Sequence, residues 1–107
     1  MSNVFVLQAK SGVDVSDAER FGTVVHLLTD QLDLEEDPVR ALNVFEVMLA
    51  GYKDDDYILP LGDPSIILVA GFYLARMGLM SLNILRWDPK TRTYHPIRTA
   101  RRTATLR

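Results

Sequence analysis

The chain has 107 residues, of which 48% are hydrophobic and 24% are charged. This length suits one domain with one core, and this composition is typical of a folded globular protein. The chain contains no cysteine, which excludes disulfides, thiolate metal sites and cysteine nucleophiles. The amino terminus lacks the basic and apolar segments of a signal peptide, so we expect a cytoplasmic protein.

The formal net charge of −2 is distributed unevenly along the chain. Met1 to Leu85 carry 13 acidic and 5 basic side chains, whereas Arg86 to Arg107 carry 1 acidic and 7 basic side chains. The longest apolar run, Ser65 to Ala75, is shorter than the roughly 20 residues that span a bilayer. We therefore expect no membrane role and a basic carboxyl-terminal region.

The amino-terminal part predicts two strands with a short helical turn between them. Asn3 to Ala9 and Thr23 to Thr29 are rich in β-forming residues. Ser16 and Glu19 have the spacing of a capping box, which predicts one short helical turn that ends at Gly22.

Two Asp-Pro pairs predict the two main helices. Asp37 precedes one helix and Asp63, with Pro64, opens the other. An aspartate at this position accepts a hydrogen bond from the first helical turn, and proline there loses no needed donor. Gly62 supplies the turn before the second helix, so Asp37, Gly62, Asp63 and Pro64 are structural residues in this interpretation. The second helix is apolar nearly all round, which predicts that it is the most buried.

Three further strands complete the predicted order. Tyr57 to Leu61 form the third strand, and Pro60 within it indicates a strand end or an edge position. Leu82 to Trp87 form the fourth strand and Thr93 to Ile97 the fifth, with a turn from Asp88 between them.

The order β-β-α-β-α-β-β predicts a small α/β domain of two or three layers. We expect a mixed sheet that finishes with an antiparallel hairpin. Residues 1–97 form the predicted domain, and residues 98–107, which hold four arginines and no acid, form a basic, flexible tail.

No pattern of side chains predicts catalysis. The two histidines, His26 and His95, are far apart, and His26 suits a half-buried strand position. The acids occur in consecutive runs, including a solvated run from Asp54 to Asp56, and no serine-nucleophile or phosphate-loop motif is present. We therefore expect a non-enzymatic protein without cofactor or metal. The turn from Gly62 to Ser65 remains an alternative site for a nucleotide or other small ligand.

The basic carboxyl-terminal end is the predicted binding region. Its arginines, lysine and aromatic side chains have the composition of an interface. The candidate partner-binding residues are Arg86, Trp87, Lys90, Arg92, Tyr94, Arg98, Arg101, Arg102 and Arg107. Their partner is an acidic protein surface, a second copy of this chain, or nucleic-acid phosphate.

Three segments carry a resemblance to small proteins of tailed bacteriophages. They are DYILPLGDP from Asp56 to Pro64, LRWD from Leu85 to Asp88, and YHPI from Tyr94 to Ile97. They resemble a D-Y-L-L-x-x-G-D-P … L-K-W-D-R … Y-x-P-V pattern, with Arg86 where lysine is frequent and Pro89 after the aspartate. The resemblance implies a phage setting, and hence the cytoplasm of a bacterial host, and it brings no activity or catalytic residues.

The leading hypothesis is a non-enzymatic phage accessory protein that binds a macromolecular partner. It would modulate a host protein or form a small component of a phage assembly. Nucleic-acid binding through the basic hairpin and tail is the first alternative, and ligand binding at the Gly62 turn is the second.

Overall fold

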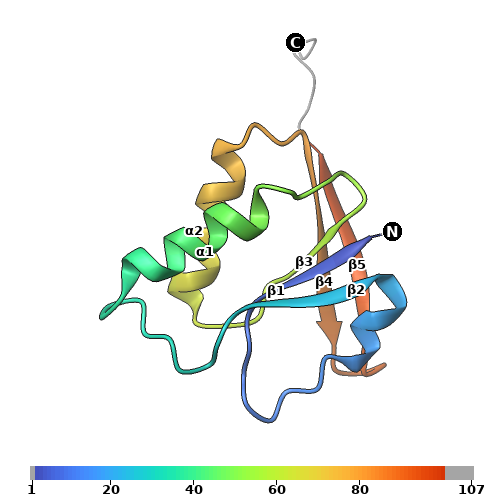
Figure 1. Ribbon diagram of the computed structural model, residues 1–107. Helices are drawn as coiled ribbons and strands as arrows, with labels where there is room; N and C mark the ends of the chain where they lie inside the picture. Colours follow the sequence, from blue (N-terminus) through green and yellow to red (C-terminus); the bar gives the residue numbers. More distant parts are fainter. Residues whose placement is uncertain (1, 101–107) are drawn as a thin grey trace.

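The computed structural model describes residues 2–100, which form one five-stranded sheet with two helices and one 3₁₀ turn (Figure 1). The strands are β1 (Asn3–Gln8), β2 (Thr23–Leu28), β3 (Tyr57–Leu59), β4 (Ser81–Asp88) and β5 (Thr93–Ala100). The helices are α1 (Pro38–Leu49) and α2 (Pro64–Arg76), and the 3₁₀ turn is η1 (Ser16–Phe21). The predicted α/β fold class and element order are confirmed.

The strand order in the sheet is β2-β1-β3-β4-β5. The first four strands are parallel, and β5 pairs antiparallel with β4 over eight residue pairs. This gives the predicted mixed sheet with a carboxyl-terminal hairpin. The chain moves outward in opposite directions from β1 and from β3, so the switch point of the sheet, where α/β proteins often bind ligands, lies between these two strands.

The two faces of the sheet are covered unequally. Helices α1 and α2 lie on one face, and the smaller η1 lies on the other (Figure 1). Successive β1 side chains point to opposite faces. Phe5 and Leu7 therefore pack in the core beneath the helices, whereas Val4 and Val6 pack in a smaller core with η1.

The predicted caps of both helices are confirmed. Asp37 Oδ1 accepts the N–H of Arg40 at 3.2 Å, and Asp63 Oδ1 accepts the N–H of Ser65 at 2.8 Å. The predicted capping box at Ser16 is wrong, although the helical turn itself is present. The N–H of Ser16 instead donates to Asp14 Oδ1 at 2.8 Å, so this turn is fixed by the residue two positions earlier.

The structure differs from the sequence-based predictions at the ends of two strands and in the exposure of one histidine. Strand β3 ends at Leu59, as the proline after it suggested, and β5 continues to Ala100. Residues 98–100 thus belong to the sheet rather than to a tail, and residues 101–107 lie outside the described residues. His26 is exposed rather than half-buried.

Helix α2 is apolar nearly all round but is buried along only one side. Leu68 is 75% exposed and Phe72 is 66% exposed. The helix contacts the sheet only through one stripe, which includes Ile66, Ala70 and Leu74. Although α2 is apolar nearly all round, no other part of the described chain covers its outer side.

Asp56 is buried rather than part of a solvated acidic run, since it is 1% exposed. Its carboxylate accepts the N–H groups of Asn3 and Lys53, each at 2.8 Å. Its backbone carbonyl accepts the Tyr52 hydroxyl at 3.0 Å and the Asn83 amide at 2.9 Å. Asp56 therefore joins β1, the loop before β3 and β4.

In the part of the chain that the structure describes, no helix has the length and apolar character to cross a membrane.

Candidate functional site

The first opening lies at the switch point, at the carboxyl ends of β1, β2 and β3. We call it the switch-point crevice, and its volume is about 750 Å³. It is lined by Gln8, Lys10, Asp30, Gln31, Leu32, Asp33, Leu34, Glu35, Pro38, Asp63, Ser65 and Ile66. Four of these side chains are acidic and one is basic, so the crevice repels a phosphate or another anion.

Gln8 holds the strands together at the floor of this crevice. It is 1% exposed, and its Oε1 accepts the N–H of Asp63 at 2.8 Å. Its Nε2 donates to the carbonyl oxygens of Thr29 at 3.1 Å and Leu32 at 3.2 Å. Gln8 thus satisfies the backbone groups that a ligand at a switch point usually contacts. Sequence reasoning missed this residue because a glutamine at the end of an apolar strand carries no local signal of burial.

Gly62 is the residue that lets the chain pass close to Gln8. Its φ is +133°, and a β-carbon there would lie 2.7 Å from the Gln8 Cβ. Only glycine adopts this backbone conformation without strain and fits this space. The Gly62–Asp63–Pro64 turn is therefore a packed, self-capped helix start, and the geometry gives no support to a ligand there.

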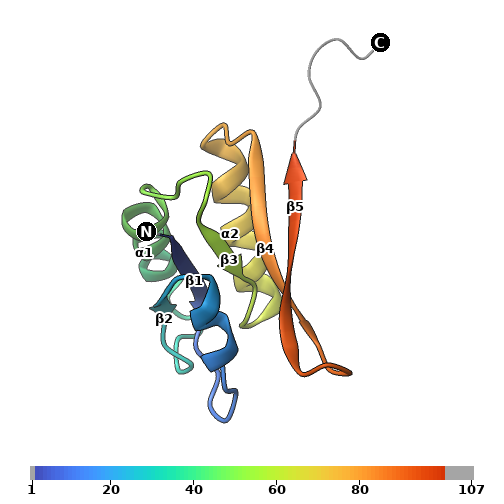
Figure 2. The same ribbon diagram turned by 90° about the vertical axis from the view of Figure 1, so that its right-hand side faces the viewer.

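The second opening is larger and lies between the end of β3 and the β4–β5 hairpin. We call it the fork groove, and its volume is about 790 Å³. It is lined by Gly12, Val13, Asp14, Ser16, Asp17, Leu59, Pro60, Leu61, Ile84, Leu85, Arg86, Trp87, Arg92, Tyr94 and Ile97. Figure 2 looks onto the η1 side of the sheet and shows β4 and β5 continuing past the end of β3.

The fork groove begins where Pro60 ends the pairing of β3 with β4. Ile58 and Ile84 form the single residue pair between these strands. After Leu59 the chain turns, because the N–H of Leu61 donates back to the carbonyl of Leu59 at 2.8 Å. It then runs toward β1, where the Leu61 carbonyl accepts the N–H of Gln8 at 3.0 Å.

Trp87 and Tyr94 form the aromatic wall of the fork groove. Their ring centroids are 4.9 Å apart in an edge-to-face arrangement. Tyr94 is 4% exposed and packs with η1, and its burial raises the pKa of its hydroxyl. Trp87 is 42% exposed, so it offers the open aromatic surface that interfaces use.

The edge of β5 is capped where it faces η1. Asp17 Oδ2 accepts the N–H of Tyr94 at 2.7 Å, and the Arg20 guanidinium donates to the Tyr94 carbonyl. The Tyr94 N–H, and after it the hydrogen bond and the charge of Arg20, hold the pKa of the Asp17 carboxyl below its usual value. These bonds occupy the backbone groups of an otherwise exposed edge strand, which anchors the hairpin to η1.

The hairpin turn positions Arg92 at the rim of the groove. The N–H of Lys90 donates to Asp88 Oδ1 at 2.9 Å and holds the pKa of that carboxyl below its usual value. This confirms Asp88 as the residue that sets the turn. Arg92 has a φ of +57°, and its N–H donates to the Asp88 carbonyl at 2.7 Å. Within residues 2–100, Arg86 and Arg92 make no ion pair.

Arg98 is separate from this basic rim. Its guanidinium lies 3.0 Å from Asp54 Oδ1 and donates to Asn83 Oδ1 at 2.8 Å, near the start of β4. The Ser81 hydroxyl and then Arg98 lower the pKa of Asp54. Arg98, one of the predicted partner-binding residues, is therefore paired within the protein, and it is not among the residues that line the fork groove. The predicted partner-binding residues Arg101, Arg102 and Arg107 lie outside the described residues.

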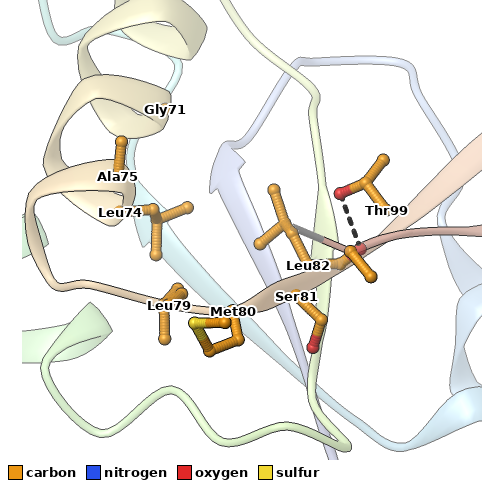
Figure 3. A pocket seen from close by; sticks show the side chains of 9 residues that line it. Gly71, Leu74, Ala75, Leu79, Met80, Ser81, Leu82 and Thr99 are labelled. Carbon is orange, nitrogen blue, oxygen red and sulfur yellow. Dashed lines mark hydrogen bonds between the residues drawn. The ribbon is translucent and has the colours of Figure 1, made fainter. Parts of the chain in front are cut away.

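A third opening is a shallow apolar hollow of about 280 Å³ beside α2. Figure 3 shows Gly71, Leu74 and Ala75 of α2 on one side, with Leu82 and Thr99 of the hairpin on the other. The Thr99 hydroxyl donates to the Leu82 carbonyl at 3.3 Å, so this polar group is already used. The hollow offers little that could orient a ligand.

The fork groove combines apolar, basic and acidic side chains. Within residues 2–100 its two arginines make no ion pair, whereas its acids, Asp14 and Asp17, already accept backbone N–H groups. Among residues 2–100, no group of three histidine, aspartate or glutamate side chains is placed to hold a metal ion. Of the predicted partner-binding residues, the structure brings Arg86, Trp87, Arg92 and Tyr94 to this groove.

A protein-family profile described as "Phage Pam3 gp32-like protein" matches residues 2–100 of the chain. The match covers every element of the sheet and both helices. No curated protein and no solved structure matches the chain.

Proposed function

This chain belongs to the phage Pam3 gp32-like family, and from that premise we propose that it is a non-enzymatic phage accessory protein that binds a protein partner in the fork groove. The partner is a host protein or another component of the phage. The observation that carries the proposal is that the half-exposed Trp87 lines a groove of about 790 Å³ together with Arg86 and Arg92, which make no ion pair within residues 2–100.

The residue types of the fork groove support a protein partner. Tryptophan, tyrosine and arginine contribute most of the binding energy at protein interfaces when they sit in or beside pockets. Leu59 and Leu85 give the groove an apolar floor, and both are nearly fully buried. An apolar side chain of a partner would bury further surface there, and a partner carboxylate would pair with Arg86 or Arg92.

The charge layout favours protein over nucleic acid. Nucleic-acid binding needs several unpaired basic side chains along a phosphate backbone. In the described residues, Arg98 is paired with Asp54, and two carboxylates share the groove with its two arginines. A mixed, partly apolar groove suits a protein surface better than a phosphate backbone.

Affinity capture from bacterial host lysate, with and without nuclease, tests this proposal. We expect the full-length protein to retain a protein partner after nuclease treatment, and Trp87→Ala to lose it. Gln31→Ala is the matched control, because Gln31 is exposed in the switch-point crevice and should leave capture unchanged. Capture that disappears with nuclease would favour nucleic acid, and equal capture by Trp87→Ala would exclude the fork groove.

A further inference from the structure

The backbone of β4 has a free edge that faces the fork groove. Along an antiparallel pair of strands, the backbone N–H and carbonyl groups of one residue bond the partner strand, and those of the next residue point away from it. Pro96, which has no N–H, pairs with Leu85. Leu85 and Pro96 therefore form a pair whose backbone groups point away from each other's strand. The same alternation directs the backbone N–H and carbonyl groups of Asn83 and Trp87 away from β5, toward β3 and the groove.

Two hydrogen bonds in the structure agree with this assignment. The N–H of Asn83 donates to the Tyr52 hydroxyl at 3.0 Å rather than to β5. The N–H of Tyr94, which pairs with Trp87, donates to Asp17 at 2.7 Å rather than to β4. The N–H of Asn83 therefore points away from β5, and the N–H of Tyr94 points away from β4.

Pro60 explains why the edge of β4 is free. The parallel pair between Ile58 and Ile84 uses the Ile58 N–H and carbonyl. The next donor that β3 would offer to β4, for the Leu85 carbonyl, is the N–H of residue 60. Proline has no N–H. The Leu85 carbonyl and the N–H and carbonyl of Trp87 therefore face the fork groove without a strand partner.

We propose that the fork groove receives an extended segment of the partner protein, which pairs as a β-strand with β4 at Leu85 and Trp87. This inference rests on the proposed function and specifies its partner. Adding a strand to an exposed edge is a known mode of peptide recognition, in which backbone bonds give affinity and alternate side chains give specificity.

The groove also predicts the sequence of this segment. Side chains that point to the η1 face would meet Leu59, Leu85 and Trp87, so these positions should be apolar. Side chains near the rim would meet Arg86 and Arg92, which are unpaired within the described residues, so acidic residues should be enriched there. The expected segment alternates apolar residues with polar residues that include carboxylates.

The outer edge of β5 does not suit such a segment. On the outer side of β5, Asp17 and Arg20 occupy the backbone groups of Tyr94. Pro96 removes the next outward donor. Pro96 thus protects the outer edge of β5, whereas Pro60, after β3, leaves the end of β4 next to the groove without a strand partner.

Selection of peptides from a random nonapeptide display library by the full-length protein supplies the probe. We expect peptides with the alternating apolar and acidic pattern. In the best peptide, N-methylation of alternate backbone amides should weaken binding to the unaltered protein by at least about tenfold, or about 1.4 kcal/mol. N-methylation of the intervening amides should change binding little.

A pair of variants makes the same test from the side of the protein. Trp87→Ala removes the indole and keeps the backbone N–H, whereas Trp87→Pro removes both. Trp87→Pro should fold, because the lost N–H points away from β5, just as the ring nitrogen of Pro96 points away from β4. We expect Trp87→Ala to weaken peptide binding and Trp87→Pro to weaken it by at least about a further tenfold.

The outcomes separate this inference from the proposed function. If Trp87→Ala weakens binding but every N-methylated peptide binds like its parent, the groove is a binding site and strand addition is wrong. If Trp87→Ala binds the selected peptides as tightly as the unaltered protein, both the proposed function and the inference are wrong. The N-methylation result decides between the two even if Trp87→Pro does not fold.

Discussion

The switch-point crevice and the fork groove open at the carboxyl ends of neighbouring parallel strands, yet only one of them remains available for binding. At the crevice, Gln8 uses its amide to bond three backbone groups, at Thr29, Leu32 and Asp63, and four acidic residues line the same opening. At the fork groove, Pro60 ends the pairing of β3 with β4, and the groove is lined by aromatic and apolar side chains and by two arginines without an ion pair in the described part of the chain. The topology of the sheet produces both openings, and single residues, Gln8 and Pro60, determine which of them stays open.

The largest effect should come from removing the amide that closes the crevice. Gln8→Leu keeps an apolar side chain but leaves the Asp63 N–H and two carbonyl oxygens without their partner. We expect a loss of about 3 kcal/mol in the free energy of unfolding, measured by urea denaturation. Gln31→Leu is the matched control, since Gln31 is exposed. Equal losses in the two variants would show that Gln8 does not close the crevice.

A somewhat smaller loss should follow from crowding Gln8. Gly62→Ala places a β-carbon 2.7 Å from the Gln8 Cβ and does so at a φ of +133°. We expect a destabilisation of about 2 kcal/mol in the same urea measurement. Gly51→Ala, where a β-carbon meets nothing within 4 Å, should cost much less. A Gly62→Ala protein as stable as the Gly51→Ala protein would argue against this close approach.

The bond that anchors the hairpin should depend on pH. The pKa of Asp17 is lowered in the folded protein, so its carboxylate stabilises the fold above its ordinary pKa of 3.8, and this stabilisation disappears as the pH falls through the lowered value. Asp17→Asn should therefore be less stable than the unaltered chain at pH 7. The difference between the two midpoints of thermal unfolding should shrink below pH 3.8. A difference that stays constant from pH 7 to strong acid contradicts this role.

The smallest effect on stability should come from the open groove. Trp87 is 42% exposed, and its ring lies edge-to-face with the ring of Tyr94. Trp87→Ala should cost about 1 kcal/mol, measured by urea denaturation followed by circular dichroism. Loss of the fold in this variant would mean that Trp87 is a structural residue rather than an open binding surface.

Local signals explain what the sequence could predict. The aspartate caps at Asp37 and Asp63, the turn at Asp88 and the strand end at Pro60 each depend on neighbours within a few residues. The element order follows from these signals and from hydrophobic patterning. The aromatic and basic residues of the last hairpin were also identifiable, because their type alone suits an interface.

Contacts between distant segments explain what the sequence could not predict. Gln8 bonds residues 21 to 55 positions away, and Asp56 bonds Asn3 across 53 positions. Arg98 meets Asp54 across 44 positions. Neither the burial of an acid in an acidic run nor the pairing of an arginine in a basic run has a local pattern. The exposure of Leu68 and Phe72 likewise depends on which layers cover α2.

Photo-cross-linking in host cells tests most directly which of the two openings binds a partner. A photoreactive phenylalanine analogue would replace Trp87 in the fork groove or, in a second protein, Gln31 in the switch-point crevice. We predict a discrete cross-linked protein from position 87 and none from position 31. Cross-links from position 31 alone, or equal products from both positions, would contradict the assignment of the fork groove as the binding site.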